Sequence, residues 1–198
     1  MTDKTAARHA DHDDRHDGLQ TQIHYTTIPS GDLLPVTLDT KHYPVKPRGA
    51  EIGAITKRMQ TRGSIYVTRA ELCAHLEAGG TIVCGCYMPS PEGWGAFVGQ
   101  RVFALDFDDG LITADEATRR ALGLGLDVIA VHPTFSHADD TPRFRVVIDG
   151  GETIECEGEA QVAISWLLMQ FPEADQRCRN CNRLFFGSPG ELYPMSAD

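Results

Sequence analysis

The sequence lacks any long hydrophobic run. Its apolar stretches are far shorter than the ~20 residues that a membrane-spanning helix needs. The polar, charged N-terminus also lacks the apolar core of a signal peptide. We therefore expect a cytoplasmic protein with no membrane partner. No internal repeat is apparent, so the 198 residues predict one sizeable domain, or a small domain with tails.

An excess of positive charge is also missing. The formal net charge is −10, which argues against a protein that coats nucleic acid along its whole surface. The distribution is uneven, because residues 41–70 hold seven Lys and Arg against one Glu, a local charge of 7 − 1 = +6. These are Lys41, Lys46, Arg48, Lys57, Arg58, Arg62 and Arg69 against Glu51. Such a basic segment can follow a phosphate backbone on an otherwise acidic protein.

The cysteines lack a zinc-finger pattern. Cys84, Cys86, Cys178 and Cys181 would supply four sulfur atoms, the ligand number of a structural zinc site. However, C-x-C is poor spacing for zinc, and no second C-x-x-C is present. We expect free thiols, as is usual in a reducing compartment, and no structural Zn²⁺.

Composition divides the chain into four segments. Residues 1–22 are polar and charged and are expected to be a disordered tail. Residues 23–64 carry Pro and most of the basic cluster, which predicts an extended or accessory segment. Residues 65–192 hold the regular apolar patterns and are expected to form the main domain, with 193–198 as a C-terminal tail.

Helix and strand patterns alternate along the main domain. Capping-box sequences at Thr68 and Thr113 predict helices that begin there, and a third helix is expected over 158–171. Strands are expected at about 81–87, 101–108, 127–132, 143–148 and 182–186. This order favours an α+β fold in which helices cover one face of a sheet and leave the other face open.

The stretch 102–110 organises the candidate site. It alternates as a strand, so Asp106 and Asp108 share the face opposite to the three large apolar residues Phe103, Leu105 and Phe107. Two such carboxylates lie roughly 6–7 Å apart along a strand, a separation at which both can reach a pair of divalent ions. The alternative is a strand end that runs into a solvated acidic turn.

The strand at 143–148 carries a matching set of cations. Arg143 and Arg145 have the same parity as the two aspartates, and His137 precedes this strand. Arginines form bidentate contacts with phosphate, so these residues predict a nucleoside-triphosphate site beside the carboxylates. The alternative is that both arginines pair with Asp139 and Asp140 on the surface.

Three ordered segments carry a family resemblance. Phe103–Gly110, Thr134–Ile148 and Phe171–Gly187 are similar to motifs of the archaeo-eukaryotic primase superfamily. More narrowly, they resemble the primase-polymerase domains of phage, plasmid and other mobile-element replication proteins. The resemblance covers roughly residues 65–190. It implies a sheet like that of an RNA-recognition motif (RRM), antiparallel or mixed, with nucleotidyl transfer on its open face.

The resemblance also implies a role for each matching residue. The catalytic and metal-binding carboxylates would be Asp106, Asp108 and Asp175, which would bind Mg²⁺ or Mn²⁺, with Asp149 as the alternative to Asp175. The nucleotide-binding residues would be Ser136, His137, Arg143, Arg145 and Arg183. The family usually spaces its second motif Ser-x-His, whereas Ser136 and His137 are adjacent here.

The implied activity is template-directed primer synthesis or extension in DNA replication. The partners would be a single-stranded DNA template, NTPs or dNTPs, and a separate or fused helicase, because no helicase sequence follows the third motif. Two other functions stay open. One is a non-catalytic single-strand-binding or replication-initiator module of the same fold, and the other is a metal-dependent nuclease.

Overall fold

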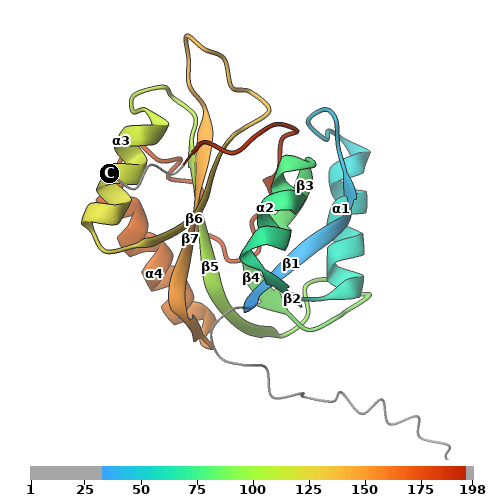
Figure 1. Cartoon of the computed structure of the whole chain (residues 1–198). Coiled ribbons are helices and arrows are strands. Elements are labelled where there is room, and N and C mark those ends of the chain that lie inside the picture. The colour runs from blue at the N-terminus through green and yellow to red at the C-terminus, as the bar shows by residue number, and fades with distance from the viewer. Residues whose placement is uncertain (1–32, 195–198) are drawn as a thin grey trace, which may run out of the picture.

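The computed structural model describes residues 33–194, which form eight strands and four helices (Figure 1). The strands are β1 (Leu33–His42), β2 (Ile65–Thr68), β3 (Gly80–Val83), β4 (Gly85–Tyr87), β5 (Phe97–Phe107), β6 (Asp127–Pro133), β7 (Phe144–Ile154) and β8 (Phe185–Phe186). The helices are α1 (Ala50–Arg62), α2 (Arg69–Glu77), α3 (Ala114–Gly123) and α4 (Glu157–Gln170). The predicted tail 1–22 and residues 195–198 lie outside the described residues. No helix within 33–194 is long and apolar enough to cross a membrane.

The strands form two four-stranded sheets in which every pair is antiparallel. One sheet has the order β2-β1-β3-β8, and the other has the order β4-β5-β7-β6. The expected α+β class is therefore present, with two sheets in place of the expected single one. Figure 1 shows α3 and α4 on one side of β5 and β7, and α2, β1 and β3 on the other.

The second sheet is buried on both faces, which corrects the expectation of an open face. Phe103, Leu105 and Phe107 belong to the core under α3 and α4. On the other face, Val102 and Ala104 pack in a second core with residues of β1, β3 and α2. The small apolar residues on this face allow the first sheet to cover it. Polar residues lie toward both ends of this face, with Asp149 opposite Val102 and with Asp106 and Asp108 after Ala104 at the end of β5.

Local capping signals place two helices correctly. Thr68 caps α2 through a complete capping box, in which its side chain accepts from the Glu71 N–H and Glu71 reaches back to the Thr68 N–H. Thr113 caps α3 by accepting from the Glu116 N–H at 3.2 Å. Each bond satisfies a helix N–H group that has no partner within its helix.

The segment 23–64 is not simply extended. Its described part contains β1, which pairs with both β2 and β3, and the helix α1. The apolar stripe of α1 is narrow, because Ile55 and Met59 are its only fully buried residues. A stripe of two residues is a weak helical signal, which explains why the sequence pattern did not predict this helix.

The predicted strand 81–87 is two strands in different sheets. The chain leaves the first sheet after Val83 and enters the second at Gly85. The Gly85 N–H donates to the Cys181 carbonyl at 3.0 Å, and a Cβ at Gly85 would lie 2.6 Å from that oxygen. Glycine therefore permits the close approach of the C-terminal segment. The predicted strand 182–186 is reduced to Phe185–Phe186.

Candidate active site

The two aspartates of the central motif lie at the C-terminal end of β5. Asp106 is opposite Arg145 of β7, and Arg145 is opposite His132 of β6. These three residues form a polar row across one end of the second sheet. Asp106, Arg145 and His132 are 7%, 3% and 1% exposed, so the row begins in the core and leads to the surface at Asp108.

Asp106 and Arg145 form a buried ion pair. The Arg145 Nε donates to Asp106 Oδ1 at 2.6 Å, and its Nη1 donates to the Phe186 carbonyl at 2.9 Å. The guanidinium also lies over the Phe185 ring, 4.8 Å from its centroid. Through these contacts, Arg145 orients Asp106 and joins β8 to the second sheet.

Asp175 reaches the same place from the segment after α4. Its backbone N–H donates to the Asp106 carbonyl oxygen at 2.7 Å. Its carboxylate accepts from the Arg177 N–H at 3.0 Å and from Arg183 Nη2 at 3.0 Å. Burial opposes ionisation of Asp175, but these donors and the Arg183 charge outweigh it and lower its pKa. Two segments far apart in sequence therefore meet here: the end of β5 with Asp106 and Asp108, and the segment after α4 with Asp175.

Asp108 differs from its two neighbours. Among the described residues it has no hydrogen-bond or ion-pair partner. Burial raises its pKa, the charges of Asp106 and Asp175 raise it further, and Lys46 lowers it in part. Asp108 is therefore a carboxylate in a negative environment, the condition under which a cation is bound most strongly.

A cavity of about 110 Å³ opens between the two sheets at this point. Asp106, Asp108, Arg145, Arg183, Thr134 and Lys46 contribute to its lining. Lys46 belongs to the loop between β1 and α1, so the first sheet supplies a cation to a pocket whose acids come from the second.

Buried polar atoms without partners gather around this cavity. Six such side-chain atoms occur within residues 33–194, and four are near the site: His132 Nε2, Thr134 Oγ1, Arg143 Nε and Arg183 Nε. A buried donor without a partner costs free energy, and an orphaned group in a native fold calls for an explanation. Three of the four can donate to an anion, which is the simplest explanation of their clustering.

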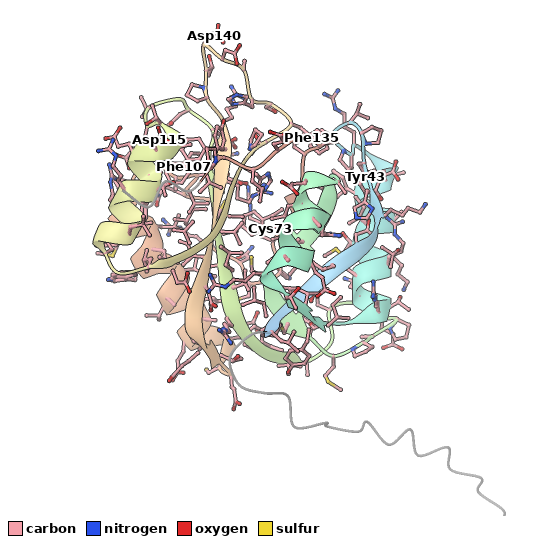
Figure 2. All side chains as sticks on the ribbon, viewed as in Figure 1. Tyr43, Cys73, Phe107, Asp115, Phe135 and Asp140 are labelled. Atoms are coloured by element: carbon pink, nitrogen blue, oxygen red, sulfur yellow. The ribbon has the colours of Figure 1, made fainter. Side chains whose placement is uncertain are left out.

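The loop after β6 carries His137 and leads to Arg143, whose charge acts on Asp108. Figure 2 shows this loop, tipped by Asp140, rising from the end of the sheet at which Phe107 and Phe135 lie. His137 Nδ1 accepts from the Arg143 N–H at 3.2 Å, so the neutral ring carries its proton on Nε2 and can donate it. Ser136 is exposed, and Ser136, His137 and Arg143 are all outside the cavity lining.

Asp149, the alternative third carboxylate, lies elsewhere. It is opposite Val102 and Asp127, four residues along β7 from Arg145 and so about 13 Å away. Arg101 Nε donates to its carboxylate at 2.7 Å, and Arg69 Nη2 does so at 2.9 Å. Asp149 therefore serves an ion-pair network that ties α2 to the second sheet.

The donor types suit a divalent cation, but the arrangement does not yet form a ligand group. Within the described part of the chain, no three His, Cys, Asp or Glu side chains lie together as a metal site. Asp106 and Asp175 each face an arginine, which leaves Asp108 as the carboxylate with open lone pairs. A cation at Asp108 would complete its shell only if Asp106 or Asp175 turned toward it.

Sequence reasoning missed the contributions of three residues. His132 is fully buried, and its pKa is lowered to about 3, mainly by burial and also by the Arg145 charge. The position of His132 in the alternation of its strand was the only signal of this role in the sequence. Thr134 stood in a recognised motif without a role. Lys46 was counted only as part of the basic cluster, because nothing in the sequence pairs it with Asp108.

Comparison of the chain with protein-family models, with curated proteins and with solved structures finds no match.

Proposed function

We propose that this protein is a template-directed nucleotidyltransferase, a primase-polymerase of the archaeo-eukaryotic type with an RRM-like catalytic sheet. It would use NTPs or dNTPs to make or extend primers on single-stranded DNA during mobile-element replication, together with a separate or fused helicase. The motif resemblance supports this proposal. The structural observation that carries it is one cavity lined by Asp106, Asp108, Lys46 and Arg183, with unpartnered donors on Thr134 and Arg183. Asp175 lies beside this cavity, where its backbone N–H donates to the Asp106 carbonyl.

Each group in the site has a place in this proposal. Arg143 and Arg183, whose Nε atoms have no partner among the described residues, would hold the phosphates of the nucleotide, and His137 Nε2 would donate to a phosphate oxygen. Arg145 is a positioning residue, because its contacts with Asp106 and Phe186 occupy it. Mg²⁺ or Mn²⁺ held by Asp108, with Asp106 or Asp175, would supply activation of the attacking hydroxyl and charge neutralisation.

A second candidate function also has specific support. The arginine partners of Asp106 and Asp175 leave no preformed metal-ligand group in residues 33–194. This arrangement favours a non-catalytic module that binds single-stranded DNA through its cations alone. The two candidates differ in one property, since binding by the module would need neither a metal nor Asp108.

The deciding experiment is extension of a labelled primer-template, run in parallel with priming on bare single-stranded DNA. Each reaction contains NTPs or dNTPs with Mg²⁺ or Mn²⁺. The test variant is Asp108→Asn, which removes the charge without removing a hydrogen bond, and the matched control is Asp140→Asn at the exposed loop tip. We expect metal-dependent products from the wild type and the control and none from Asp108→Asn.

Other outcomes contradict the proposal. An absence of product, with equal single-strand binding by wild type and Asp108→Asn, would favour the binding module. Shortening of the labelled strand in place of growth would identify a nuclease.

A further inference from the structure

A second, larger cavity lies beside the carboxylate cavity. Its volume is about 450 Å³, and it lies in the loop between β1 and α1. Tyr43, Val45, Lys46, Pro47, Arg48 and Glu51 line it. Lys46 lines both cavities, so the two cavities are neighbours. The volume falls within the range of about 300–1,000 Å³ that is typical of small-ligand sites.

The basic cluster divides into cations that are used by the fold and cations that are not. Arg58 pairs with Asp39, and Arg69 pairs with Asp127 and Asp149. Lys57 donates to the Pro91 carbonyl. The remaining cations are exposed, and within residues 33–194 their side chains have no hydrogen-bond or ion-pair partner: Lys41, Lys46, Arg48 and Arg62. The loop and α1 thus keep four unpaired positive charges on a protein whose net charge is −10.

A buried network holds Tyr43, one wall of the larger cavity, in place. The Asp39 carboxylate accepts from Arg58 Nε at 2.7 Å and from the Tyr43 hydroxyl at 3.0 Å. The Tyr43 N–H donates to the Gly79 carbonyl at 3.1 Å. These bonds join β1, α1 and the end of α2, so the loop that carries Lys46 starts from a fixed base. A wall that is already fixed, as Tyr43 is, adds no ordering cost when a ligand binds.

We propose that this cavity is the entry subsite for single-stranded DNA, with Lys46 and Arg48 on its phosphates. This inference rests on the proposed function and adds the location of the strand. Outside the cavity, unpaired cations also occur at Lys41, near the end of β1 that leads into the loop, and at Arg62, at the far end of α1. A mononucleotide would need only the cavity, whereas a strand also meets the outlying charges. The exposed Val45, with 70% of its surface accessible, offers an apolar contact for a base.

Salt-dependent binding of a fluorescein-labelled oligodeoxythymidine tests the inference. The titrations are done in EDTA, so that no chemistry occurs, with wild type, Lys46→Ala, Lys46→Ala/Arg48→Ala and the control Arg119→Ala. Arg119 is an exposed cation on α3, and no partner of its side chain occurs among the described residues. Each lost phosphate contact makes the negative slope of log K against log salt less steep by about 0.7 for single strands. We expect losses of about 0.7 and about 1.4 for the single and double variants, and no change for Arg119→Ala.

The outcomes separate this inference from the proposed function. An unchanged slope in a folded double variant overturns the inference, even if the wild type extends primers. A higher KM for the nucleotide with an unchanged slope also overturns it, since the cations would then serve the incoming nucleotide. A reduced slope in a protein that never extends primers supports the strand subsite, and only the proposed enzymatic function fails.

Discussion

The ion pair between Asp106 and Arg145 leads to a quantitative prediction for the variant Asp106→Ala. The two side chains are 10% and 4% exposed, so the substitution leaves a guanidinium charge buried without its partner. Breaking a buried pair in this way typically costs about 3–5 kcal/mol. Arg145 keeps its bond to the Phe186 carbonyl and its position over the Phe185 ring, so we expect the lower end, about 3 kcal/mol.

Urea unfolding and thermal unfolding, both followed by circular dichroism, measure this loss. A domain of this size loses about 2–4 °C in Tm for each kcal/mol, so we expect a fall of roughly 6–12 °C for Asp106→Ala. The double variant Asp106→Ala/Arg145→Met removes both charges and should be more stable than the single variant. Asp140→Ala, at an exposed site, is the control for loss of a surface carboxylate.

Two results would refute this reasoning. One is a loss below about 1 kcal/mol in Asp106→Ala, the range of exposed ion pairs. The other is a double variant whose loss equals the sum of the losses in the two single variants, because independent sites add in that way.

Three further predictions concern single residues. Asp108→Asn should unfold at the same or a higher temperature than wild type at pH 7, because burial and the neighbouring carboxylates raise the pKa of Asp108. Ionised Asp108 therefore destabilises the fold, so the wild type becomes less stable as the pH rises above about 3.8. A lower Tm for Asp108→Asn contradicts the account. Asp149→Asn should lose about 3 kcal/mol of unfolding free energy in urea and keep its primer-extension rate per folded molecule. The Arg101 and Arg69 bonds outweigh burial and lower the pKa of Asp149, so its contribution to wild-type stability disappears as the pH falls below about 3.8. A loss of extension at full stability would return Asp149 to the active site. His132 has its pKa lowered to about 3 by burial, so the unfolding free energy of wild type should fall by about 2 kcal/mol between pH 7 and pH 5, as the unfolded chain takes up a proton near pH 6.5. His132→Leu should lack this part of the dependence of stability on pH. An identical dependence in both proteins would show that His132 is not buried in its neutral form.

Local sequence signals predicted the elements that local forces determine. The capping residues Thr68 and Thr113 marked the starts of α2 and α3. The alternation of Phe103, Leu105 and Phe107 marked a strand with one core face. In contrast, the helix α1 was missed, because its two fully buried residues gave too weak a periodicity.

The candidate site was only partly predictable. The register confirms that Asp106 and Arg145 share a face, and it places them directly opposite each other. In that arrangement Arg145 is paired with Asp106 and is not free to bind phosphate. The alternation of residues along each strand cannot distinguish these two roles. Asp175 was separated from Asp149 only by the fold, because the segment after α4 returns to the Asp106 carbonyl.

The sequence alone determined the alternation of the Asp106 strand, the helix caps and the uneven distribution of charge, because each depends on residues close together in the chain. Only the tertiary structure decided that two sheets enclose what looked like an open face, and that Lys46 meets Asp108 across their boundary. The physical reason is that Lys46 and Asp108 are more than 60 positions apart in the chain, and the packing of apolar side chains between the sheets sets the distances across their boundary.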